Sequence, residues 1–254
     1  MKLVKYIFFD LVRSRFVFFY FLLLLLFTGT FILLQDDVSK VQLSLLNIII
    51  LVVPLVSVIF ATIHWYNSAE FIEVLLAQPV SRKRIFISEF VALSLAVGGA
   101  FILATGIPLL IFYPDLVSLL LMIGGFFLTI IFIALAFWSA VFTRDKAKGI
   151  GLSLVLWLYF SLIYDGLVLM LMFNFSDYPI DKIVVVLLSL NPVDVSRVMV
   201  LMKMEMSAML GYSGAVFTDF LGSKVGMIYS IGLLIIWSIV PFFWALRKFS
   251  KKDL

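Results

Sequence analysis

The chain has 254 residues, of which 64% are hydrophobic and 13% are charged, and its mean hydropathy is +1.21. Soluble domains are about 45–50% apolar and about 25% charged, so this composition excludes an ordinary soluble fold. The chain has no cysteine and one histidine, which excludes disulfides, thiolate metal sites and a multi-histidine metal centre within it.

Residues 1–15 predict an amphipathic helix ahead of the first apolar run. Apolar side chains share one face of the helical wheel and basic side chains lie on the other: Val4, Ile7, Phe8, Leu11 and Val12 against Lys2, Lys5 and Arg13. This pattern is typical of a helix that lies in the membrane interface. The alternative is that these residues extend the first transmembrane helix inward.

Six long apolar runs follow along the chain. Five of them continue for 19 to 28 residues without Asp, Glu, Lys or Arg, and the sixth contains only Asp165. A helix needs ~20 apolar residues to cross ~30 Å of hydrocarbon. The sequence therefore predicts an all-α, polytopic membrane protein, a single domain over residues 1–254. The expected transmembrane helices cover residues 16–34, 41–66, 85–113, 116–143, 149–173 and 225–246.

Lysine and arginine are distributed unevenly between the two sides that these crossings define. The side that carries both termini holds 14 of them, and the other side holds 5 although its connections are longer. The positive-inside rule therefore places both termini in the cytoplasm. The net charge of +4 is thus a signal of membrane orientation, and we expect no nucleic-acid partner.

Residues 67–84, between the second and third crossings, predict a short helix at the cytoplasmic surface. Asn67 followed three residues later by Glu70 is a variant of the capping box, and Pro79 cannot continue a helix, so residues 68–78 make about three turns. This helix is too short to cross the bilayer. Apolar and amide side chains form a narrow stripe along the helix, and such a stripe at the cytoplasmic surface indicates contact with a partner: Phe71, Val74, Leu75 and Gln78.

Asp165 lies within the fifth apolar run, about eight residues from its outer end. A carboxylate at that depth costs about 3 kcal/mol unless it is paired, protonated or hydrated. Ser161 and Met172 share its helical face. Two interpretations stay open: the face looks into the bundle or an outward water-filled cavity, or the carboxylate is hydrogen-bonded to a neighbouring helix as part of the packing.

Residues 174–224 form the longest connection and are expected to be the only sizeable soluble element. An apolar run over 183–190 is too short to cross the membrane. Asn191, Pro192 and Asp194 then supply an N-cap, a proline at the first helical position and an acid at the third. These signals favour a helix that runs to Leu210.

Four methionines repeat at helical spacing within this predicted helix: Met199, Met202, Met206 and Met209. Thioethers are soft ligands that select Cu(I), so one interpretation of the stripe is a copper site. Methionine also fills irregular apolar surfaces and adaptable binding faces, so the other interpretation is packing or contact with a partner.

Motifs of enzymes are absent from the sequence. It contains no G-x-x-x-x-G-K-[ST] phosphate loop, no G-x-S-x-G nucleophile elbow and no H-E-x-x-H zinc motif. His64 stands beside Trp65 and Tyr66 at the end of the second run, where an aromatic belt is typical. We therefore expect a subunit that is not itself an enzyme and binds no cofactor directly.

The segment Glu73-Val-Leu-Leu-Ala-Gln-Pro-Val-Ser-Arg-Lys-Arg-Ile85 resembles the acid-x-L-L-x-x-P-V-S-R-x-x-I signature of permease subunits in the type-2 class of ABC exporters. In that family the segment is the coupling helix, which docks on a separate ATPase subunit that binds ATP. The family is also similar in its interfacial elbow helix, its six transmembrane helices and its assembly as a homodimer of permeases. The resemblance implies a location in the bacterial cytoplasmic (inner) membrane.

Two further segments resemble the NosY subfamily, the permeases of the NosDFY transporter that matures nitrous oxide reductase with copper. They are residues 69–79, and Leu190–Asp194 together with Met209–Gly211 in the outer loop. This resemblance implies a NosF-like ATPase, a periplasmic NosD-like protein and a copper-related function.

The family resemblance assigns contact with the ATPase to six residues: Glu70, Phe71, Glu73, Val74, Leu75 and Pro79. Three basic residues would hold the flank of the coupling helix at anionic lipid headgroups: Arg82, Lys83 and Arg84. Two alternatives stay open, namely a permease of this type with a drug, lipid or polysaccharide cargo, and a scaffold that passes force to an outer protein without transport. An integral-membrane enzyme is disfavoured by the single histidine.

Overall fold

The computed structural model describes residues 2–143, 145–175, 181–204 and 223–251, and within these ranges the chain is helical and contains no strand. Six of the described helices are long and apolar enough to cross a membrane, and they are numbered here as spans 1 to 6: 15–34, 38–67, 82–112, 116–142, 146–174 and 225–251. They indicate a membrane-embedded protein. The prediction of an all-α chain with six helices long and apolar enough to cross is thereby confirmed, and the ends of these helices differ from the predicted ones by a few residues.

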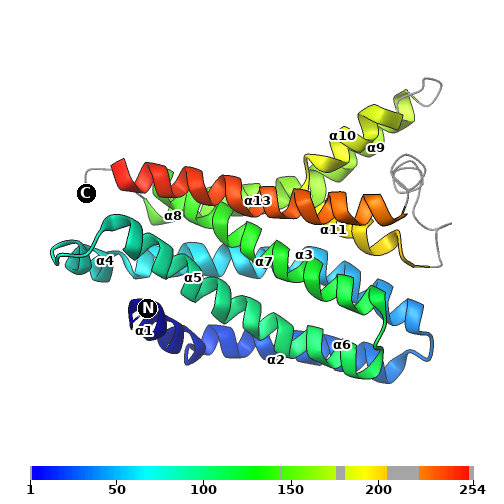
Figure 1. Ribbon diagram of the computed structural model, residues 1–254, viewed down its shortest axis with the longest axis horizontal. Helices are drawn as coiled ribbons and strands as arrows, with labels where there is room; N and C mark the ends of the chain where they lie inside the picture. The colour runs from blue at the N-terminus through cyan, green and yellow to red at the C-terminus, as the bar shows by residue number, and fades with distance from the viewer. Residues whose placement is uncertain (1, 144, 176–180, 205–222, 252–254) are drawn as a thin grey trace.

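The helices follow one another along the chain as labelled in Figure 1. The first half comprises α1 (Lys2–Val12), α2 (Arg15–Leu34), α3 (Val38–Asn67), α4 (Ala69–Leu76), α5 (Arg82–Phe101), the π-helical turn η1 (Ile102–Gly106) and α6 (Ile107–Phe112). The second half comprises α7 (Leu116–Phe142), α8 (Lys146–Leu158), the π-helical turn η2 (Tyr159–Ile163), α9 (Tyr164–Asn174), α10 (Asp181–Ser189), α11 (Pro192–Leu201) and α13 (Ser223–Lys251). Spans 3 and 5 therefore each contain a π-helical turn.

Span 4, formed by α7, is the centre of the bundle. Its apolar window is 67% buried, whereas the windows of spans 1, 5 and 6 are each 22% buried. It packs against α3, α5, α11 and α13. Two of its glycines make close contacts that a side chain would prevent, and Gly125 in particular faces the ring of Phe101. Spans 1, 5 and 6 consequently have most of their apolar surface exposed at the outside of the bundle.

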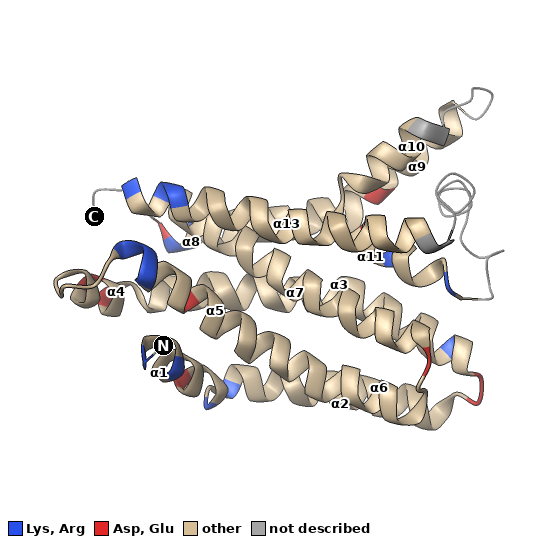
Figure 2. Cartoon of the chain, viewed as in Figure 1, with Lys and Arg blue, Asp and Glu red and all other residues tan. Residues whose placement is uncertain are grey.

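One end of the bundle carries α1, α4 and the last turn of α13 (Figure 1). Most of the described lysine and arginine residues also gather at this end (Figure 2). We call it the basic end, and the other the opposite end. With six spans, α1 and the last turn of α13 thus lie at the same end of the bundle (Figure 1).

The helix α1 is separate from span 1 and packs against α5. Ile7 and Leu11 are buried on one face, and Lys2 and Lys5 are exposed on the other. Ser14 begins α2, because its hydroxyl accepts a hydrogen bond from the backbone of Val17 at 3.3 Å. These residues therefore do not extend span 1 as a single helix, and their amphipathic pattern agrees with the predicted one.

At the opposite end, the short connection between spans 3 and 4 is fastened to span 2. The Asp115 carboxylate caps α7 by accepting from the backbone N–H of Ser118 at 2.8 Å, and it also accepts from the Gln42 amide at 2.6 Å. Partial burial raises the pKa of Asp115, but the hydrogen bonds from Ser118 and Gln42 outweigh it, so its pKa lies below its ordinary value.

The expectation of a soluble outer loop does not hold for residues 181–201. Here α10 and α11 form a pair that bends by 112°. The bend lies level with the middle of the bundle, because the Asn191 amide donates to the carbonyl of Phe160, midway along span 5, and the Trp237 indole donates to the carbonyl of Ser189. Each helix has 9 or 10 residues, about half the length that a crossing needs. Both helices extend from the bend toward the opposite end of the bundle (Figure 1), so the pair has the form of a re-entrant loop.

The contact between α8 and α3 yields a prediction about stability. A Cβ atom on Gly149 would lie 2.2 Å from the Tyr66 hydroxyl, which is hydrogen-bonded to Thr143, whereas a Cβ on Gly151 would meet nothing within 4 Å. Gly149→Leu should therefore displace Tyr66 and cost about 1–3 kcal/mol, measured as a lower thermal unfolding midpoint in detergent. Gly151→Leu is the matched control, and an equal loss in both variants would contradict this packing.

Candidate functional site

The candidate site is built around α4, which joins spans 2 and 3 at the basic end. A single residue, Ser68, separates α4 from α3, and its carbonyl accepts a hydrogen bond from Ile72 at 2.8 Å. The predicted capping box is wrong: Asn67 is the last residue of α3, and its side-chain oxygen accepts from Lys146. The backbone hydrogen bonds therefore run almost without interruption from α3 into α4.

The two faces of α4 differ in burial. Ile72 and Leu75 are buried against the chain itself, at 4% and 8% exposure. Phe71 and Val74 are 38% and 60% exposed. Leu75 was expected to contact a partner, and the structure instead turns its side chain inward, because the one-residue break after α3 fixes which face of α4 meets α3 and α5.

Acidic residues flank the exposed apolar pair of α4. Glu70 and Glu73 are exposed, and Glu70 lies in the first turn, where a negative charge is favourable to the helix dipole. Beyond the helix Gln78 and Pro79 are exposed in a turn. Lys83 and Arg84 are exposed in the first turn of α5. The segment thus presents an acidic, partly apolar helix next to a basic helix start.

A buried polar pair lies beneath α4 and links the two spans on either side of it. The His64 Nε2 atom lies 2.9 Å from the Glu89 Oε2 atom, and the Glu89 side chain is only 2% exposed. The pair borders a cavity of about 240 Å³ that is also lined by Tyr6 and Asp10 of α1 and Phe71 of α4. The Phe71 ring lies 6.3 Å from that of Tyr6.

Sequence reasoning missed Glu89 and treated His64 as part of an aromatic belt. Glu89 lies inside the predicted crossing 85–113, close to its basic start, where a charged residue is common and does not by itself indicate a buried site. The signal that was available is the coincidence of the single histidine and this acid at the same end of two consecutive crossings. Buried carboxylates require a partner, and this histidine is near enough to be one.

Aromatic rings continue this linkage into the rest of the bundle. Trp65 of α3 packs against Phe86 of α5, Phe137 of α7 and Phe249 of α13, with ring centroids 4.8 to 5.5 Å apart. Phe86 also contacts Phe137 and Phe249. This cluster therefore packs four spans against one another, through α3, α5, α7 and α13.

A second polar cluster joins the re-entrant pair to span 5. Arg197 of α11 donates to the Asp165 carboxylate at 2.9 Å and lies 3.7 Å from the Asp194 carboxylate. Asp194 is 2% exposed, and it also accepts from the Asn191 amide at 2.8 Å. Asp165 therefore has a partner on a neighbouring helix, as one of its two interpretations requires. Ser161, on the same helical face, is buried.

The methionine stripe is only partly within the described residues, because Met206 and Met209 lie outside them. The predicted start of α11 is confirmed: Asn191 caps it by accepting from Val193, and Pro192 is its first residue. The predicted end at Leu210 is wrong, since α11 ends at Leu201 and a turn follows.

The two methionines of the stripe that the structure describes, Met199 and Met202, lie in different hydrophobic clusters. Met199 packs in the central core, where it approaches Gly124 of α7, whereas Met202 packs with Val168 and Met172 of α9. In the described part of the chain no group of three or more His, Asp or Glu side chains is arranged to hold a metal ion. The observed contacts of Met199 and Met202 are those of packing.

Neither protein-family models nor curated proteins match this chain. The two features of the chain that bear most on function are the exposed face of α4 and the buried His64–Glu89 pair beneath it.

The buried pair yields a prediction. His64→Ala leaves the Glu89 carboxylate buried without its partner, and loss of one member of a buried pair typically costs about 3–5 kcal/mol. We expect a loss of that order in the free energy of unfolding, measured by denaturant titration in detergent. His64→Gln, which keeps a donor near the carboxylate, should lose less. If His64→Ala is as stable as the unchanged chain, the pair contributes nothing to holding spans 2 and 3 together.

Proposed function

We propose that the chain is the permease subunit of a type-2 ABC exporter and that α4 is its coupling helix. The observation that carries this proposal is the exposure of Phe71 and Val74 on a helix of 8 residues at the basic end. Burial of such side chains against a partner is worth about 1.5–3 kcal/mol each. An amphipathic helix set into a groove of another protein is a common way to obtain it.

In this proposal the partner is an ATPase that binds and hydrolyses ATP, because the chain carries no phosphate loop of its own. Glu70 and Glu73 would orient the helix toward basic residues of that partner. ATP-driven closure of two ATPase subunits would favour one arrangement of two permeases. The continuous path from α4 through Ser68 into α3, and across the His64–Glu89 pair into α5, supports this transmission.

A homodimer of permeases follows from the same proposal. Spans 1, 5 and 6 keep most of their apolar surface outside the single chain, which leaves room for a second copy as well as lipid. The gathering of Lys and Arg at the basic end supports an orientation with both termini in the cytoplasm of a bacterial cell, within its inner membrane (Figure 2).

The narrower proposal concerns the cargo. Resemblance to the NosY subfamily supports a role in copper-related maturation of nitrous oxide reductase, with a NosF-like ATPase and a periplasmic NosD-like protein as partners. Cu(I) would then be the ion handled by the assembly. The packing of Met199 and Met202 in separate clusters gives this role no geometric support. A drug, lipid or polysaccharide cargo, or force transmission without transport, would use the same α4 surface.

The coupling proposal predicts the effect of one charge on α4. Val74→Asp places a carboxylate on the exposed face without disturbing the buried residues of the helix. The ATPase that co-purifies with the unchanged chain should bind this variant at least about tenfold more weakly, because an apolar contact is lost and a charge is buried.

The measurement is a titration of the purified ATPase onto the detergent-solubilised chain, with turnover followed in parallel. Leu33→Asp is the control, because Leu33 is also strongly exposed, at 83%, but lies in the last turn of span 1, at the opposite end. Unchanged binding and turnover in Val74→Asp would refute the assignment of α4 as the coupling helix.

A further inference from the structure

A groove runs along the outside of the bundle, between α5 on one side and α1 and α2 on the other. Its deeper part is an apolar hollow of about 290 Å³ whose lining includes Phe8, Val12, Phe18, Leu95, Gly99 and Leu103. Toward the basic end lies a second hollow of about 520 Å³, lined by Val4, Lys5, Phe8, Val91 and Leu95. Phe8 and Leu95 line both hollows, which therefore adjoin along the groove.

Small residues of α5 keep the deeper hollow open. Ala96, Gly99 and Ala100 line it, and a Cβ atom built on Gly99 would meet no atom within 4 Å. The neighbouring Gly98 differs, because its Cβ would lie 2.7 Å from the ring of Phe126. Gly99 therefore faces empty space at the surface of the bundle, whereas Gly98 faces packed protein.

The length of the groove matches that of one acyl chain of a bilayer lipid. Val91 and Leu103 mark its two ends along span 3, and twelve residues at 1.5 Å each separate them by ~18 Å. Half of the ~30 Å hydrocarbon layer is ~15 Å. Phe18 and Leu103, which line the deeper hollow, are each 57% exposed on the outer surface of the spans. An acyl chain lying in the membrane fits this length and this chemistry.

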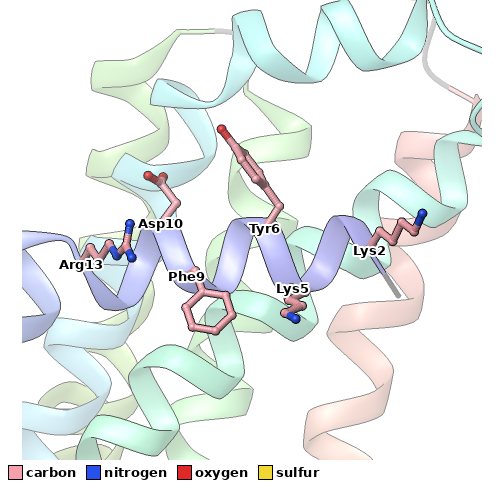
Figure 3. Close-up of a pocket in the computed structure, with 6 residues that line it drawn as sticks. All are labelled: Lys2, Lys5, Tyr6, Phe9, Asp10 and Arg13. Carbon is pink, nitrogen blue, oxygen red and sulfur yellow. The ribbon is translucent and has the colours of Figure 1, made fainter.

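Positive charge stands at the shallow end of the groove. Lys5 lines the second hollow, and with Lys2 and Arg13 it also lines a surface depression of about 480 Å³ along α1. Figure 3 shows Lys5 and Phe9 on one side of α1, and Tyr6 and Asp10 on the other. The single carboxylate of this surface is therefore turned away from Lys5. Lysine side chains at this level of a membrane are suited to anionic headgroups.

We propose that this groove is a binding site for an anionic glycerophospholipid, with one acyl chain between α5 and α1–α2 and the phosphate at Lys5 and Lys2. The combination of an apolar floor about as long as one acyl chain and cations at its mouth is what identifies the ligand. A second copy of the chain is a poorer occupant, because a two-fold contact through this surface would bring the lysines of the two copies together. The site is independent of the proposed coupling to an ATPase.

The test uses the complete chain in nanodiscs made of equal parts of phosphatidylglycerol and phosphatidylethanolamine. After extraction into detergent, native mass spectrometry counts the lipids that each chain retains. The unchanged chain should retain phosphatidylglycerol in preference to phosphatidylethanolamine. Gly99→Leu fills the groove and should lower this retention about tenfold, and Lys2→Gln with Lys5→Gln should lower the preference for phosphatidylglycerol by about tenfold or more.

Gly29→Leu is the matched control, since Gly29 also has nothing within 4 Å of its Cβ position but does not line the groove. It should retain lipid as the unchanged chain does, and all variants should elute from size exclusion alike. Equal retention in Gly99→Leu and Gly29→Leu would overturn the site. If the Lys2→Gln and Lys5→Gln substitutions leave the preference for phosphatidylglycerol unchanged, the proposed selectivity for an anionic lipid is overturned.

A photo-cross-linking amino acid in place of Leu103 distinguishes the two possible occupants. Capture of phosphatidylglycerol acyl chain supports the lipid site. Capture of a second copy of the chain, with loss of the dimer in Gly99→Leu, would replace the lipid by a protein contact and overturn the proposal.

Discussion

Every peptide group within the spans needs a hydrogen-bond partner from the chain itself, because hydrocarbon supplies none and an unsatisfied group costs several kcal/mol. This constraint accounts for the helical fold of the described residues and for the places where the fold departs from a simple bundle. The bend between α10 and α11 exposes backbone groups level with the middle of spans 5 and 6. Asn191 and Trp237 supply hydrogen bonds there, so the bend is tolerated only as part of this packing.

The same requirement shapes the basic end. Only Ser68 interrupts the helical pattern between α3 and α4, and its carbonyl is satisfied by Ile72. A short helix attached in this way cannot turn freely, and its buried residues Ile72 and Leu75 fix the face it presents. The His64–Glu89 pair then fastens span 2 to span 3. In the proposed transporter, α4 acts as a rigid extension of two spans, not as a flexible tether.

The six apolar helices could be predicted because each can be recognised within its own segment of the sequence, from the length of its apolar run. The re-entrant pair could not, since residues 183–190 are apolar but too short to cross, and their position depends on partners far away in sequence, at Phe160 and Trp237. Helical spacing alone placed Leu75 on one predicted stripe with Phe71 and Val74, although the structure buries Leu75 and exposes the other two.

The exposed stripe of α4 and the pairing of the polar side chains could not be predicted from the sequence either. The exposed stripe of α4 depends on where α3 ends, and periodicity within eight residues cannot reveal that. The pairing of Glu89 with His64 joins residues of two crossings, and the pairing of Asp165 with Arg197 joins a crossing to a segment expected to be soluble. Such tertiary contacts decide which polar residues are partners.

The central claim, that α4 docks on a separate ATPase, is tested most directly by covalent capture from its exposed face. A photo-cross-linking amino acid in place of Val74, activated in native membranes, should join the chain to a soluble subunit with a phosphate-binding loop, in a yield that changes when ATP is added. Adducts with lipid alone, or with no ATP-binding protein, would contradict the account.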